Sequence, residues 1–166
     1  LYKSMWTQIS EHFSDYSYKL IFESANEELC HRLNDSDVTG TEGVLSEDEC
    51  YETTNRINSE FVKLVRSTGG KNADRFLLIA GYNTDFRKTC DDRYQMPEDT
   101  AKDKLLLSVH YYTPWDYCSD GNAKRWGTPG DYEEQNSLFQ MLTKFTDLGY
   151  GVVTVSYTHL RAHETC

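Results

Sequence analysis

Side chains that can transfer protons or hydrogen-bond a polar ligand follow directly after three apolar runs of the sequence. They belong to Asn26-Glu27, Tyr82-Asn83 and His110-x-Tyr112. A carboxyl group such as that of Glu27 can donate a proton to a reacting oxygen and later take one from water, provided that its neighbours orient it. Glu28 is the adjacent alternative for this role. Asn26 and Glu27 could equally do no more than begin a loop.

The segments that must position these residues alternate between strand and helix. Strands are predicted near Lys19–Phe22, Phe76–Ala80, Leu105–Val109 and Val152–Val155. Each is a short, mostly apolar run, which is typical of a strand buried on both faces of a parallel sheet. Because the carboxyl ends of parallel strands meet at one edge, we expect Glu27, His110 and Tyr112 to face a common cleft.

Three further segments are predicted to be helices. Apolar residues recur at helical spacing within Met5–Tyr16, Tyr51–Val65 and Leu138–Leu148. Ser46-Glu47-Asp48-Glu49 has the spacing of a capping box, and Gly69-Gly70 should end the helix that follows it. Gly69-Gly70-Lys71 has the composition of a phosphate-binding loop. Such loops open a helix after a strand, however, whereas this one closes a helix, so we do not expect phosphate binding.

The composition restricts the classes of ligand. The 166 residues include 27 Asp and Glu against 17 Lys and Arg, a formal net charge of −10, so a nucleic acid backbone would be repelled. An uncharged sugar is compatible with this charge, and twelve tyrosines and three tryptophans offer flat faces for sugar rings. The longest apolar run is far shorter than the roughly 20 residues of a membrane span, so no membrane is expected as a partner.

The cysteines and histidines do not form a metal-binding motif. Five cysteines are widely spaced and include no Cys-x-x-Cys pair, which speaks against a zinc ribbon or a thioredoxin motif. His159 and His163 lie at helical spacing, but they have no further ligands beside them. We therefore expect neither a metal nor a cofactor.

Four segments, in this order, resemble glycoside hydrolase family 5 and, within it, the bacterial endoglucanases and xyloglucanases. The segments are Leu20-Ile21-Phe22-Glu23-x-x-Asn26-Glu27, Ser59–Gly70, Arg75-Phe76-Leu77-Leu78 with Gly81-Tyr82-Asn83-Thr84, and Leu107–Trp115. The resemblance runs from about Met5 to Val153. Each motif alone is modest, but their order makes the resemblance specific.

The resemblance implies a role for each candidate residue. Family members cleave β-1,4-glycosidic bonds with retention, and the acid/base glutamate of an Asn-Glu pair corresponds to Glu27. Asn26 is then expected to hydrogen-bond the 2-hydroxyl of the sugar. His110 would line the substrate subsite, and Tyr112 would orient the nucleophile. Two tryptophans, Trp115 and Trp126, could be platforms for sugar rings or ordinary anchors of their loops.

The resemblance also implies the fold and its extent. A TIM barrel needs roughly 250 residues, and the alternative doubly wound sheet usually shows a glycine-rich first turn that is missing here. We therefore predict an α/β fold, a partial (β/α)8 TIM barrel with about half of the barrel, strands 4 to 7, in a catalytic domain of residues 1–155. In the family a Gly-Glu with the nucleophile should follow the last strand. The sequence instead continues as Thr154–Cys166, which resembles a translated sequencing adapter, and residues 156–166 are expected to be a poorly packed, non-native tail.

These inferences define the expected function. The chain is expected to be a fragment, inactive by itself, of a retaining endo-β-1,4-glucanase of the cellulase or xyloglucanase type that acts on plant β-glucan. The parent is expected to be a secreted monomer. The alternative is a non-catalytic carbohydrate-binding or structural α/β domain.

Overall fold

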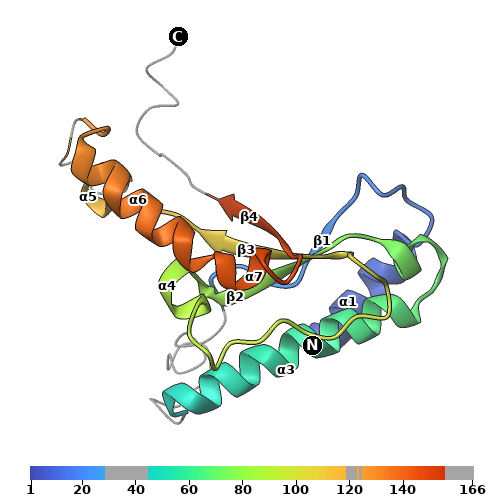
Figure 1. Cartoon of the computed structure of the whole chain (residues 1–166). Helices are drawn as coiled ribbons and strands as arrows, with labels where there is room; N and C mark the ends of the chain where they lie inside the picture. Colours follow the sequence, from blue (N-terminus) through green and yellow to red (C-terminus); the bar gives the residue numbers. More distant parts are fainter. Residues whose placement is uncertain (29–44, 119–122, 124, 156–166) are drawn as a thin grey trace.

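The computed structural model describes residues 1–28, 45–118, 123 and 125–155, and it shows a sheet with most of its helices packed on one face (Figure 1). The strands are β1 (Phe22–Glu23), β2 (Leu77–Asp85), β3 (Leu105–His110) and β4 (Gly151–Val155). Their order in the sheet is β1-β2-β3-β4, and every neighbouring pair is parallel. The predicted parallel sheet in sequence order is therefore confirmed. The expected tail, with His159 and His163, lies outside the described residues.

Two strands differ in length from the prediction. β1 pairs with β2 at only two positions, and the residues from Lys19 to Ile21 are not part of the ladder. β2 continues five residues beyond Ala80 and is irregular between Ala80 and Asp85. Asn83 and Thr84 there have positive φ angles of 51° and 49°, a conformation that costs side-chain-bearing residues about 1 kcal/mol or more each.

Most of the helices of the described residues pack against one face of the sheet (Figure 1). The helices are α1 (Tyr2–His12), α3 (Glu47–Ser67), the 3-10 helix η2 (Gly70–Asp74), α4 (Phe86–Thr89), α5 (Trp115–Cys118), α6 (Pro129–Met141) and α7 (Thr143–Thr146). The predicted capping box of α3 is present, because the Ser46 side chain accepts from the Glu49 N–H while the Glu49 carboxylate accepts from the Ser46 N–H. The third predicted helix is divided into α6 and α7, which meet at Leu142.

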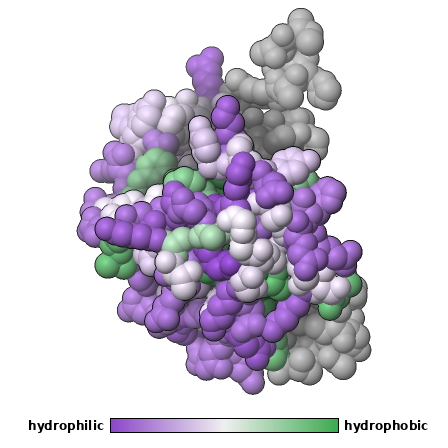
Figure 2. Space-filling model, turned by 90° about the vertical axis from the view of Figure 1, so that its right-hand side faces the viewer, coloured by the Kyte–Doolittle hydropathy of each residue, from purple (hydrophilic) through white to green (hydrophobic). Residues whose placement is uncertain are grey.

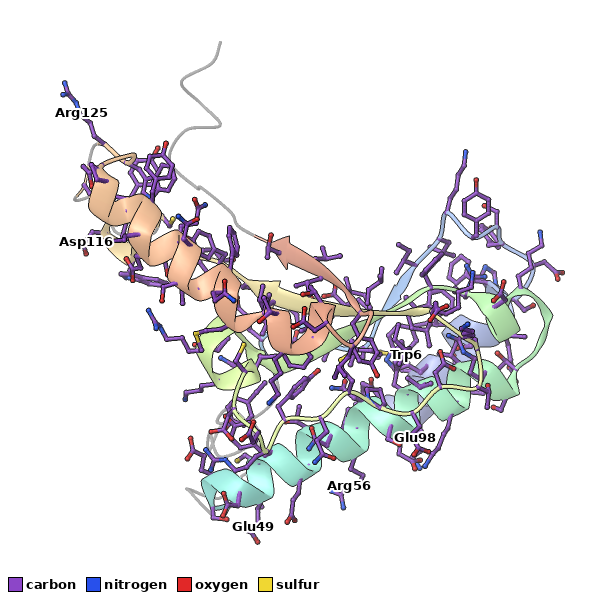
Figure 3. All side chains as sticks on the ribbon, viewed as in Figure 1. Trp6, Glu49, Arg56, Glu98, Asp116 and Arg125 are labelled. Atoms are coloured by element: carbon purple, nitrogen blue, oxygen red, sulfur yellow. The ribbon has the colours of Figure 1, made fainter. Side chains whose placement is uncertain are left out.

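Two buried clusters join the helices to the sheet. Trp6 of α1 packs against Phe22 of β1 and Phe61 of α3, with ring centroids 5.6 and 4.7 Å apart, and it lies between the helices and the sheet (Figure 3). The second cluster gathers Leu107 and Val109 of β3 with residues of α3, α4, α6 and α7. From the side on which the strands begin, the surface is mostly hydrophilic and its hydrophobic residues form separate small patches (Figure 2).

A buried arginine holds the segment that leads into β1. Arg75 is 1% exposed, and its Nε–H donates to the Asn72 side chain at 2.7 Å. Its other four N–H groups donate to main-chain carbonyls of Phe13, Tyr16, Ser17 and Leu20, at 2.6 to 3.1 Å. The guanidinium also lies 4.6 Å from the centroid of the Phe22 ring. These hydrogen bonds hold residues 13–20 as a turn, whereas the sequence predicted that a strand begins near Lys19.

Gly81 allows α4 to approach β2 closely. A Cβ at this position would lie 2.3 Å from Oγ1 and 2.8 Å from Cγ2 of Thr89. We expect Gly81→Ala to lower the free energy of unfolding by about 1–3 kcal/mol, because the added methyl overpacks a buried contact. Urea denaturation would measure the loss.

Two further variants test this explanation. Thr89→Ala removes both clashing atoms, and the buried Thr89 hydroxyl has no hydrogen-bond partner within the described residues, so the Gly81→Ala/Thr89→Ala pair should recover most of the loss. Gly130→Ala is the matched control, because the nearest atom to its added Cβ would be Thr128 Oγ1 at 3.9 Å, an ordinary contact. A loss that persists in the double variant would contradict the steric cause.

Candidate active site

The carboxyl ends of β2 and β3 and the segment after β1 open into one cleft of about 880 Å³. Glu27, Asn83, His110, Tyr112 and Trp115 are among the side chains that line it. Each of the three polar clusters that follow predicted strands thus contributes at least one side chain to the same cleft. A parallel sheet of this kind places its site residues at the carboxyl ends of its strands.

Glu27 and His110 are in direct contact across the cleft. Oε1 of Glu27 lies 2.5 Å from Nδ1 of His110, although the two residues are separated by the whole of β2 in the sheet. The His110 side chain is 9% exposed, whereas that of Glu27 is 49% exposed. With its proton on Nδ1, the imidazole donates to the carboxylate and holds it, while the exposed part of the carboxyl group remains accessible from the cleft.

Tyr112 completes this group of side chains. Its ring meets the His110 ring edge to face, with centroids 5.9 Å apart and planes at 81°. Burial raises the pKa of the Tyr112 phenol above its ordinary value, and the negative charge of Glu27 adds to the shift. The phenol therefore stays protonated at neutral pH and can donate a hydrogen bond.

The two tryptophans lie in different environments. Trp115 is 57% exposed and lines the cleft. Its ring and the Tyr112 ring meet edge to face, with centroids 6.3 Å apart. Trp126 is not among the cleft-lining residues and packs against the Tyr132 ring, with centroids 4.8 Å apart. Trp115 thus has the placement of a sugar platform, while Trp126 has that of a loop anchor. Their roles remain predictions.

The neighbours of Glu27 in the sequence do not share its position. The Asn26 backbone N–H donates to the carboxylate of Glu28 at 2.8 Å, which closes a local turn. Neither Asn26 nor Glu28 is among the residues that line the cleft. Of the two adjacent glutamates, Glu27 is the one that lines the cleft. The hydrogen bond from Asn26 to a sugar hydroxyl remains a prediction.

The cleft also contains charged residues that the sequence analysis did not single out. Arg87 of α4 lies 3.5 Å from Glu134 of α6, and both line the cleft. Asp85 lines it too and caps α4 by accepting from the Lys88 N–H at 2.7 Å. Asp116 of α5 also lines the cleft, near one end of the molecule in the view of Figure 3. No local motif marks these residues, because only the tertiary fold brings them to the same cleft.

No group of three or more His, Cys, Asp and Glu side chains in the described part of the chain is arranged to hold a metal ion. Among the helices of the same part, none is long and apolar enough to cross a membrane.

The amino-acid sequence of this chain is similar to those of known endoglucanases. The chain is 32% identical over 174 residues to endoglucanase A of Paenibacillus barcinonensis, which covers 92% of this chain and 41% of that protein. It is 36% identical over 129 residues to a xyloglucan-specific endo-β-1,4-glucanase of Bacteroides ovatus, over 75% of this chain and 24% of the relative. The chain therefore spans less than half of the length of these relatives.

The fold of this chain also superposes on solved structures of glycoside hydrolases. A GH5-4 broad specificity endoglucanase from an uncultured bovine rumen ciliate superposes with a TM-score of 0.75 at 35% identity, covering 91% of this chain and 44% of its own. A glycoside hydrolase 5 lichenase from Caldicellulosiruptor sp. F32, in complex with cellotetraose, gives a TM-score of 0.78 at 29% identity, with 92% and 43% covered. The four parallel strands are thus about half of a (β/α)8 barrel.

The family described as cellulase (glycosyl hydrolase family 5) matches residues 1–161 of the sequence. This match covers nearly the whole chain, and it agrees with the relatives and with the superposed barrels. The chain belongs to glycosyl hydrolase family 5.

Proposed function

We propose that this chain is the part of a retaining endo-β-1,4-glucanase that carries the acid/base catalyst, Glu27. The observation that supports this most directly is the Glu27 carboxyl group, which is accessible from a cleft of about 880 Å³ and held at 2.5 Å by the nearly buried His110. Relatives named as endoglucanases and as a xyloglucan-specific glucanase support the same reaction class. We infer that the substrate is a β-glucan.

In this mechanism Glu27 acts twice. It first donates a proton to the oxygen of the departing sugar and then removes a proton from the water that releases the glycosyl-enzyme intermediate. Tyr112 is proposed to orient the nucleophile, Trp115 to stack on a sugar ring, and Asn26 to bind a 2-hydroxyl group. Trp126 would contribute only through its loop.

Retention requires a second carboxylate about 5–5.5 Å from the acid. The sequence has no Asp or Glu between Val155 and Glu164, so the end of β4 offers none. We therefore propose that this chain lacks the nucleophile. We also propose that residues 156–166 are a non-native tail, although the family match extends to residue 161. The complete enzyme is proposed to be monomeric and secreted, as expected for a hydrolase that acts on plant polysaccharide.

The first test compares this 166-residue chain with a complete enzyme in which the last strand continues into a Gly-Glu. We expect the complete enzyme to release reducing sugars from xyloglucan and lichenan, and this chain to release none above background. Comparable turnover by the two would show that the nucleophile has been misplaced. Binding of β-glucan by the complete protein without hydrolysis would favour the non-catalytic alternative.

A further inference from the structure

A closed set of hydrogen bonds lies directly beneath the segment that carries Glu27. The main-chain ladder between β1 and β2 ends where the Ser24 N–H donates to the Leu78 carbonyl at 2.9 Å. Two residues further along β2, the Ala80 N–H donates to the Ser24 hydroxyl oxygen at 2.9 Å instead of to a main-chain carbonyl. The Ser24 side chain thus takes the place of a strand partner at the point where β1 ends.

Asn58 of α3 closes the set from the helix side. Its Oδ1 accepts from the Ser24 hydroxyl at 2.8 Å, and its Nδ2 donates to the Ala80 carbonyl at 2.9 Å. The Tyr94 hydroxyl donates to the same carbonyl at 3.0 Å. Asn58 and Ala80 are fully buried, and Ser24 and Tyr94 are 2% and 1% exposed. The Ala80 carbonyl only accepts, so the amide of Asn58 has one orientation that satisfies both bonds.

The same amide is connected to both sides of the cleft. Glu27 lies three residues after Ser24, and Ala80 begins the irregular segment that reaches the cleft at Asn83. Asn58 itself does not line the cleft. With only two residue pairs between β1 and β2, few other main-chain bonds determine where the chain leaves β1 toward Glu27.

We propose that Asn58 is a positioning residue, which acts through Ser24 and Ala80 to hold the Glu27 carboxyl group against His110. This inference rests on the proposed function of Glu27 as the acid. Displacing a catalytic group by about 1 Å costs on the order of 10²-fold in rate. Loss of the Asn58 amide should therefore impair proton donation by Glu27. Tyr112 and Trp115, which line the cleft from the segment after β3, should stay in place.

The test uses the complete enzyme with the variants Asn58→Leu and Ser24→Ala. Asn58→Leu keeps the branching of the side chain at Cγ, with a somewhat larger volume, and removes both bonds of the amide. Ser24→Ala removes only one hydroxyl and serves as the test if Asn58→Leu does not fold. We expect kcat/KM on xyloglucan to fall about 10- to 100-fold. On an activated nitrophenyl glycoside, whose leaving group needs little protonation, kcat/KM reports formation of the intermediate and should change less than about threefold.

Asn55→Leu is the matched control. Asn55 is also a bridging asparagine of α3, but it donates to the Arg93 carbonyl at 2.8 Å and accepts from the Gln95 N–H at 3.1 Å, away from the strand ends. This variant should retain the parental ratio of the two activities. The imidazole ¹⁵N signals of His110 give a second readout. We expect them to shift in Glu27→Gln, in Asn58→Leu and in Ser24→Ala, and to stay in place in Asn55→Leu.

The outcomes separate the two proposals. Equal losses of kcat/KM on both substrates, or unchanged His110 signals in folded Ser24→Ala, would overturn the positioning role. If Glu27→Gln itself fails to distinguish the two substrates, the proposed function of Glu27 is wrong. If Glu27→Gln distinguishes them and Ser24→Ala behaves as the parent, only the inference about Asn58 is wrong.

Discussion

Replacing Glu27 by Gln in the complete enzyme is expected to lower kcat/KM on β-glucan by about 10²- to 10⁴-fold, the usual contribution of a positioned general acid and base. The amide keeps the shape of the side chain but has no proton to give to the departing oxygen. A nitrophenyl glycoside leaves without that proton, so formation of the intermediate should continue on this substrate. Values of kcat/KM on the two substrates, which report the steps up to formation of the intermediate, would measure the difference.

Glu28→Gln is the control for this prediction. Glu28 lies next to Glu27, but its carboxylate accepts from the Asn26 backbone N–H and does not line the cleft. Its replacement should change kcat/KM by less than about threefold on either substrate, in line with a surface substitution away from the cleft. A larger effect from Glu28→Gln than from Glu27→Gln would move the acid to Glu28. Equal losses of kcat/KM on both substrates in Glu27→Gln would indicate that Glu27 positions other groups.

Arg75→Met is expected to lower the free energy of unfolding by about 3–5 kcal/mol, the largest stability loss predicted here. Four main-chain carbonyls and the Asn72 side chain lose their donors at once. Each buried acceptor left without a partner costs about 1–3 kcal/mol, and water that enters the site would recover part of the total. Equilibrium denaturation of the complete enzyme would measure the loss.

Two further arginine variants serve as controls for this prediction. Arg75→Lys keeps the charge, but an ammonium group has three donors and cannot reach acceptors spread around a planar guanidinium, so it should recover less than half of the loss. Arg87→Met is the exposed control, because the Arg87 side chain is 62% exposed and its ion pair with Glu134 spans 3.5 Å. It should stay within about 0.5 kcal/mol of the parent. A loss below about 1 kcal/mol for Arg75→Met would contradict the assigned role.

The strands and their order could be predicted because each buried strand is a continuous apolar run between polar segments. The prediction failed where side chains replace the regular ladder. Lys19 to Ile21 look like the start of a strand, but the preceding turn is held by Arg75, more than fifty residues away in the sequence. The end of β1 depends on the Ser24 hydroxyl and on Asn58, which no local pattern connects.

The site was predictable to the extent that it follows strand ends. Glu27, His110 and Tyr112 line one cleft because parallel strands bring their carboxyl ends together. Arg87 and Glu134 reach the same cleft from helices, and their position depends on how α4 and α6 pack. The sequence alone contains no signal for that packing. For Trp126 the sequence suggested a possible site residue that does not line the cleft, because its ring packs against Tyr132.

The contacts of Arg75 also bear on how this region can change during evolution. Four of its five donors bind carbonyl groups of the peptide backbone, and every amino acid supplies such a carbonyl. Substitutions at Tyr16 and Ser17, whose side chains are exposed, therefore leave the acceptors in place. A change in the number of residues in the segment would move them. We expect homologous enzymes to tolerate many sequences in this turn but few lengths, which makes its surface a permissive place for engineered substitutions and a poor one for insertions.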